Sequence, residues 1–180
     1  KKEKKILSND APDATHVAFI DSILLANEKN SGRFAHANFG DARTWDPLDV
    51  FAADSKPDHV TAVMITPFRE ILVAGPQSVE QYSRLEGETP FYRRWTVDEG
   101  ILAPYTMVFE DGGVFCVNSK KEFVRLSLQN SEPVSKDIAR VLTRITEQDW
   151  QGAWTERFEI GGQRFLILQI PNAETPYGGS

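Results

Sequence analysis

Four short apolar segments recur along the chain at a nearly constant spacing, and this recurrence restricts the fold more than any other feature. They occupy residues 23–26, 71–74, 114–117 and 165–168, so successive segments begin 43 to 51 residues apart. Self-similarity at a period of roughly 40–50 residues is typical of the blades of a β-propeller. The period therefore favours one supersecondary unit that is used about four times.

Each apolar segment follows a partner segment across a short turn. The partners are residues 16–20, 60–65, 105–109 and 156–160, and the turns are residues 21–22, 67–70, 111–113 and 161–162. Asp-Gly and Gly-Gly supply the positive φ angles that two-residue hairpin turns require. At least the last two pairs are thus predicted to be β-hairpins.

A third strand is predicted after three of the hairpins, at residues 33–39, 79–82 and 122–128. A hairpin plus a third strand, repeated at this period, predicts an all-β, propeller-like array of about four antiparallel blade repeats. The repeats lie near residues 15–40, 58–83, 104–128 and 154–172, within a β domain at 15–175. We expect flexible ends at 1–14, a basic and polar tail, and at 176–180. Four repeats are at the lower end of the usual range of roughly four to eight blades, so open edge strands should be protected by a partner copy or prone to association.

One segment departs from the β pattern. Ser135 can cap a helix in which Ile138, Val141, Leu142 and Ile145 recur at helical spacing. We therefore predict one inserted amphipathic α-helix near residues 135–146, between the third and fourth repeats.

Charge and composition restrict the function classes. The 180 residues are 41% hydrophobic and carry a net charge of −6, which is typical of a globular chain and opposes tight nucleic-acid binding through phosphate contacts. No apolar run approaches the roughly 20 residues of a membrane span, and no apolar region follows the N-terminal lysines as in a secretory signal. We expect neither tight nucleic-acid binding nor membrane binding.

The chemistry-bearing residues are scattered. His16, His36 and His59 form no paired metal-binding motif, and the one cysteine, Cys116, lies in an apolar strand where burial would raise the pKa of its thiol. No P-loop, G-x-G-x-x-G or G-x-S-x-G motif occurs. We therefore predict no catalytic residue, metal or cofactor, and no enzyme activity.

An acidic stretch is the densest polar region, and its five aspartates are Asp41, Asp46, Asp49, Asp54 and Asp58. Neighbouring carboxylates could bind calcium or act as a glycosidase pair, but the EF-hand spacing is absent. Asp46, before Pro47 at the start of an expected helical turn, and Asp58 stand where aspartate caps backbone amides. Structural capping is favoured. A carbohydrate-active or glycan-binding propeller, with Trp45 as a sugar-stacking platform, stays open as an alternative, as does a host propeller that serves as an interaction scaffold.

Aromatic and arginine side chains in predicted loops are candidate interface residues, since such side chains dominate many protein interfaces. They are Trp45, Phe91, Tyr92, Arg93, Arg94 and Trp95. The alternative interpretation is that they cover the ends of the blades.

Several motifs resemble one known family. The segments FGDARTWDPLDVFAA at 39–53 and KPDHV at 56–60 resemble the "D…W…LD…A…PD.I" stretch of packaged-DNA stabilisation proteins, the tail-hub accessory factors of short-tailed bacteriophages. The segment REILVAGPQSVEQY at 69–82 is similar to the strand pair "R.L.LFG..S.E.W" of that family, and PFYRR at 90–94 to its "PF.R" loop. PVS at 133–135 and GQRFLILQIP at 162–171 match a later blade, so the order of the motifs is preserved from about residue 15 to 175.

The resemblance implies a structural virion protein that assembles as a ring below the portal after DNA packaging and helps to seal the head. The implied partners are copies of the chain itself and the portal, tail adaptor and tail needle or fibre proteins. The implied location is the virion tail, after synthesis in the host bacterial cytoplasm. Family members are considerably longer, so we expect a fragment, a truncated prophage copy or a smaller relative.

Overall fold

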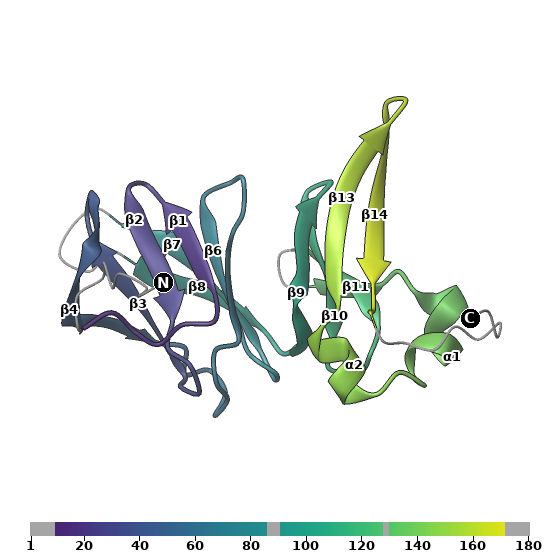
Figure 1. The fold of residues 1–180 in the computed structure, drawn as a ribbon, viewed down its shortest axis with the longest axis horizontal. Helices are drawn as coiled ribbons and strands as arrows, with labels where there is room; N and C mark the ends of the chain where they lie inside the picture. Colours follow the sequence, from purple (N-terminus) through teal and green to yellow (C-terminus); the bar gives the residue numbers. More distant parts are fainter. Residues whose placement is uncertain (1–9, 86–90, 128–129, 172–180) are drawn as a thin grey trace, which may run out of the picture. The chain divides into compact units, whose positions relative to one another are not determined.

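The computed structural model describes residues 10–85, 91–127 and 130–171 (Figure 1). The chain divides into two compact units, residues 1–96 and 97–180, and each is described by itself.

The first unit contains two four-stranded antiparallel sheets, ordered β1-β2-β3-β4 and β5-β6-β7-β8. The strands of the first sheet are β1 (Val17–Ile20), β2 (Ile23–Asn27), β3 (Arg33–Asn38) and β4 (Asp41–Ala52). Those of the second are β5 (Ala62–Ile65), β6 (Glu70–Ala74), β7 (Val79–Arg84) and β8 (Phe91–Val97), which runs to the boundary of the unit.

The second unit contains a four-stranded sheet, ordered β12-β11-β10-β9, and the two-stranded hairpin β13-β14. The strands are β9 (Ile101–Glu110), β10 (Gly113–Asn118), β11 (Phe123–Ser127), β12 (Asn130–Pro133), β13 (Trp154–Ile160) and β14 (Gln163–Gln169). Four-stranded sheets whose strands follow one another in sequence are the blades expected from the repeat, which confirms the predicted fold class.

The two-residue turns explain the predicted hairpins. Ile160 pairs with Gln163 and Glu110 with Gly113, so both hairpins predicted from glycine turns are confirmed. Gly161 and Gly162 have φ of 60° and 75°. Positive φ at both central residues gives the type I′ turn, whose twist matches that of the flanking strands.

Each of the first three blades has a fourth strand that the sequence pattern did not reveal: β4, β8 and β12. The helical turn expected at Asp46 is wrong, because these residues belong to β4. Ala37 pairs with Trp45 and Ala35 with Val50, so the residues between them form a bulge in the ladder. Such a bulge tolerates Pro47, which has no backbone N–H to donate.

The predicted helix at 135–146 is divided. A 3-10 turn, η1 (Lys136–Ile138), leads into α1 (Ala139–Leu142), and α2 (Glu147–Gln151) follows. Thr146, with extended backbone, accepts a hydrogen bond from the Asp149 amide and begins a new helix there. Ser135 makes no cap bond; its hydroxyl accepts from the Phe123 amide at 3.0 Å. The expected single helix capped by Ser135 is therefore wrong.

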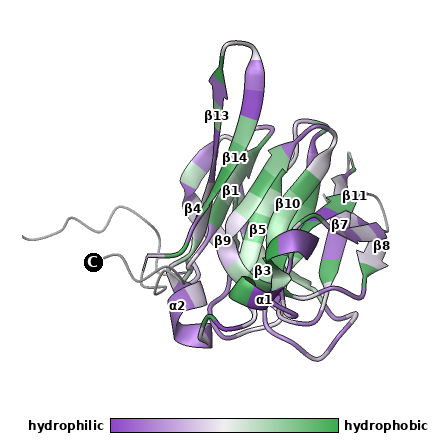
Figure 2. Cartoon of the chain, turned by 90° about the vertical axis from the view of Figure 1, so that its right-hand side faces the viewer, coloured by the Kyte–Doolittle hydropathy of each residue, from purple (hydrophilic) through white to green (hydrophobic). Residues whose placement is uncertain are grey.

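Each unit has its own core between neighbouring blades. In the first unit β1 lies beside β5, and the buried residues include Leu25, Phe34, Ile71 and Phe91. In the second unit β13 lies beside β9, and the fully buried Trp150 of α2 packs in the cluster that Leu168 joins. Figure 2 shows the apolar character of strands β5 and β10. Burial accounts for the first three apolar segments, whose strands β2, β6 and β10 are mostly buried, whereas in the fourth only Leu168 joins a core cluster.

Candidate protein-interaction surface

Trp45 lies in the interior of the first blade. It belongs to β4, is 4% exposed, and packs with Ala26, Ala35 and Ala37. Its indole N–H donates to the Ala42 carbonyl at 3.2 Å. The structure thus corrects the placement of Trp45 in a loop, and a buried indole offers no platform for sugar stacking.

The other expected interface residues lie on strand β8 and not in a loop. Because successive side chains of a strand point to opposite faces, these residues are divided between two faces. Phe91 is buried among aromatic side chains, with its ring centroid 5.3 Å from Phe51. Arg93, on the same face, reaches the polar network described below. Tyr92 and Arg94 are exposed on the opposite face, and the half-buried Trp95 returns to the face of Phe91.

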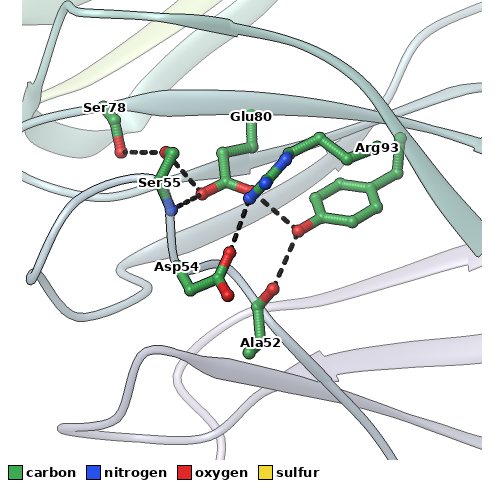
Figure 3. Close-up of polar contacts among 7 residues, drawn as sticks. Ala52, Asp54, Ser55, Ser78, Glu80 and Arg93 are labelled. Atoms are coloured by element: carbon green, nitrogen blue, oxygen red, sulfur yellow. Dashed lines mark hydrogen bonds and ion pairs between the residues drawn. The ribbon is translucent and has the colours of Figure 1, made fainter.

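A buried carboxylate, Glu80 on β7, is the centre of a polar network between the first two blades (Figure 3). Its side chain is 1% exposed. Oε1 accepts from the Ser55 amide at 2.9 Å and from the Ser55 hydroxyl at 2.6 Å. Oε2 accepts from the Tyr82 hydroxyl at 2.7 Å and from Arg93 at 3.2 Å. Ser55, Tyr82 and Arg93 all donate to the carboxylate, and such bonds stabilise its charged form.

Two further contacts tie this network to the end of β4. The same Arg93 nitrogen donates to Asp54 at 2.7 Å, and the Tyr82 hydroxyl lies 3.0 Å from the Ala52 carbonyl oxygen. Residues 52–55 connect the first blade to the second, so the network fixes the link between two blades.

The ionisation of the network follows from burial and from its hydrogen bonds. Burial alone would raise the pKa of Glu80, but the hydrogen bonds from Ser55, Tyr82 and Arg93 hold its pKa below the ordinary 4.5. Burial and the neighbouring Glu80 carboxylate raise the pKa of Tyr82. The tyrosine therefore remains a hydrogen-bond donor, and Glu80 an anion, at neutral pH.

Arginine–carboxylate links join blades at two other places. Asp21, in the turn after β1, contacts Arg69 at 2.5 Å and Arg84 at 2.9 Å, both in the second blade. Glu110, at the end of β9, contacts Arg157 at 3.2 Å and Arg164 at 2.5 Å in β13 and β14. In both links the carboxylate comes from the first hairpin of one blade and an arginine from the first hairpin of the next. The sequence pattern did not show these links, because their partners are 47 to 63 residues apart.

The acidic stretch has structural partners. Asp41 accepts from the Arg43 amide and the Thr44 hydroxyl, and Asp46 accepts from the Leu48 amide at 2.8 Å. Asp58 accepts from the Gln77 amide at 2.7 Å. These contacts confirm the capping role expected of Asp46 and Asp58, although Asp46 caps a bulge and not a helix.

The remaining chemistry-bearing residues form no catalytic constellation that the structure reveals. Burial raises the pKa of the Cys116 thiol, which is fully buried. In the ranges 10–85, 91–127 and 130–171, no three His, Cys, Asp or Glu side chains are grouped as metal ligands would be. The same ranges contain no helix that is long and apolar enough to cross a membrane.

Comparison with known families adds a decisive observation. Residues 1–179 match the family described as "Bacteriophage P22 Gp10, beta-propeller". The chain belongs to this family. The match confirms the resemblance to phage stabilisation proteins, and the Gp10 family is one of phage stabilisation proteins, not of enzymes.

A solved structure supports the fold of this Gp10-family chain. YCF48 from Cyanidioschyzon merolae is similar with a TM-score of 0.52 at 14% sequence identity. The likeness covers 87% of this chain and 48% of the other, so the chain spans about half the length of that protein. At this identity the likeness concerns the fold alone. No curated protein matches the chain.

Proposed function

We propose that this chain acts as a structural component of the phage tail hub, where it helps to close the portal and keep packaged DNA in the head. The observation that carries the proposal is the match to the Gp10 family over residues 1–179. In this proposal the chain assembles with copies of itself and with portal, tail adaptor and needle or fibre proteins. It is made in the cytoplasm of the host bacterium and ends in the virion tail.

The charge of the chain is consistent with a plug that contains DNA without holding it. A net charge of −6 disfavours phosphate contacts, whereas closing a channel requires protein contacts. In a gel-shift series over salt concentration, we expect no tight complex with duplex DNA. A tight complex whose affinity falls steeply with salt would contradict this part of the proposal.

DNA retention tests the proposed role directly. A phage from which the gene is deleted should package DNA and then lose it. The DNA of these virions should therefore be digested by added nuclease. Supplying the protein in trans should restore nuclease-resistant DNA. If virions without the protein retained their DNA as well as complemented virions, the sealing role would be wrong.

Two of the expected interface residues remain suited to a partner contact. Tyr92, 39% exposed, and Arg94 lie on the outer face of β8. Because neither supports the Glu80 network, replacing both with alanine should reduce incorporation into virions by about tenfold while the thermal midpoint stays unchanged. The matched control replaces Arg43 and Leu48, which are exposed on β4, with alanine. Equal incorporation of the two double variants would remove Tyr92 and Arg94 from the interface.

A further inference from the structure

Each four-stranded sheet ends in a fourth strand that is paired on one edge only. β4, β8 and β12 pair with β3, β7 and β11, and among the residues that the structure describes no strand pairs with their second edges. Along such an edge, every second residue directs its backbone N–H and C=O groups away from the sheet. An open edge is therefore a template on which another strand can be added.

Five of the six edge strands of these sheets carry features that oppose strand addition. β4 contains Pro47 and a bulge, and β12 has only four residues and contains Pro133. At the opposite edges, β1 and β5 have four residues each, and β9 contains Pro104. Proline cannot donate a hydrogen bond to a new strand, and a short or bulged edge offers it few partners.

Strand β8 has none of these features. Its seven residues, FYRRWTV, include neither proline nor glycine. Five of the seven are aromatic or β-branched, the residue types that favour extended strands. One four-stranded blade precedes the blade of β8 in the sequence and another follows it, so this edge does not arise where the sequence begins or ends. Of the six edges, β8 is the one best suited to accept a strand.

The side chains of β8 determine which charge an added strand should carry. β8 contains two arginines and no acidic residue. Arg93 contacts Asp54 at 2.7 Å and Glu80 at 3.2 Å, whereas Arg94 is exposed and forms no ion pair with any described residue. A carboxylate beside Arg94 would complete a cross-strand pair of opposite charge. A second copy of β8, paired antiparallel about Arg94, would instead place two arginines opposite each other, which is destabilising.

We propose that β8 is a docking edge for an extended, acidic segment of another protein, which adds to the sheet as a fifth strand with its carboxylates on the face of Tyr92 and Arg94. This inference rests on the partner contact proposed above for these two residues and specifies the chemistry of the partner. In this mode of recognition, main-chain hydrogen bonds supply affinity and alternate side chains supply specificity. The net charge of −6 disfavours a nucleic-acid strand at the same edge.

Amide chemical shifts of the isotope-labelled 180-residue chain, titrated with synthetic peptides, test the docking edge without any phage component. The probe is a seven-residue peptide that alternates threonine with glutamate and matches the length of β8. We expect the shifts to concentrate on β7 and β8, and a peptide with lysine in place of glutamate to bind about tenfold more weakly. The edges of β4 and β12 are internal controls and should not shift.

Three results of this titration would overturn the proposal: no binding of the glutamate peptide, equal binding of the two peptides, or shifts that are as large on β4 and β12 as on β8. Each would leave the virion role to be judged by DNA retention.

Variants of Arg94 test the charge that β8 selects. Arg94→Glu should reverse the preference, so that the lysine peptide binds more tightly, whereas Arg94→Lys should keep the preference for glutamate. The matched control Arg43→Glu, at an exposed position of β4, should leave the preference unchanged. A preference that is the same in the wild type and in Arg94→Glu would contradict the acidic partner.

A modified peptide tests strand addition without any change to the protein. Methylation of two consecutive central backbone nitrogens of the glutamate peptide removes a donor from each of its edges and keeps its charge. We expect binding to weaken by about tenfold or more. Undiminished binding would mean that charge alone holds the peptide, and larger shifts of β8 with a short oligothymidylate than with the glutamate peptide would make nucleic acid the ligand. Either result would overturn the proposal.

Discussion

At the scale of single residues, buried charge is the feature that the structure adds to the sequence. Glu80 stands in a strand that pattern alone describes correctly, yet nothing local shows that its carboxylate receives bonds from Ser55 and Arg93. The partners lie 25 and 13 residues away, and only the packing of two blades brings them together. The aspartates of the acidic stretch were easier to interpret, because an aspartate that caps a turn accepts from an amide two residues away, as Asp46 does.

Removal of the Glu80 carboxylate should destabilise the chain. Glu80→Ala removes the acceptor that Ser55, Tyr82 and Arg93 share, and Tyr82 and Arg93 keep only Ala52 and Asp54 as acceptors. We expect a loss of about 2–3 kcal/mol in the free energy of unfolding. Urea denaturation followed by tryptophan fluorescence measures it. Glu132→Ala, at an exposed strand position, is the matched control and should change stability by less than about 0.5 kcal/mol. Equal effects would show that the network does not stabilise the blade junction.

Acid should weaken the fold through the same carboxylates. The pKa values of Glu80, Asp21 and Glu110 lie below the ordinary 4.5 for glutamate and 3.8 for aspartate, so the unfolded chain binds more protons in this range. Their stabilisation is present above these ordinary values and is lost as the pH falls through the lower folded values. Urea midpoints should therefore fall as the pH is lowered below about 4.5, and less steeply for Glu80→Gln than for the wild type. Parallel pH profiles for the two proteins would contradict the assignment.

At the scale of elements, turns were predictable and edge strands were not. Gly-Gly and Asp-Gly identify hairpins because their φ requirement is local. The sequence pattern does not reveal the fourth strands β4, β8 and β12, because many of their residues are polar. In β4, Asp46 and Pro47 also lie in a bulge, outside the regular pairing with β3. The helix was overextended because apolar spacing gives no sign that Thr146 starts a new helix.

The turn between β1 and β2 offers a test of local strain. Ser22 has φ of 66°, a conformation that favours glycine, and its carbonyl accepts from the Gly40 amide. Ser22→Gly should raise the free energy of unfolding by about 0.5–1 kcal/mol, measured by urea denaturation. Ser83→Gly, the same chemical change inside strand β7, should lower it by a similar amount. Changes of the same sign at both positions would show that the φ of Ser22 does not limit stability.

At the scale of the whole molecule, most of the fold prediction follows from the repeat period. The spacing of the apolar segments predicts the blades because each four-stranded sheet has one strongly apolar strand, β2, β6 or β10, between two neighbours. The order of the motifs predicts the family that the match over residues 1–179 shows. Side-chain type alone does not separate exposed aromatic residues from core residues. Of the residues expected in loops, Tyr92 and Arg94 are exposed, whereas Trp45 and Phe91 are buried and fill cores. An interface at Tyr92 and Arg94 stays a prediction.

Cryo-electron microscopy of mature virions, with and without the protein, tests the central claim most directly. A chain of the Gp10 family that closes the portal should appear as ordered density of propeller blades at the tail hub, in contact with portal or adaptor proteins, and this density should be absent from virions that lack the gene. Virions with an unchanged tail hub in both preparations would contradict the proposed function.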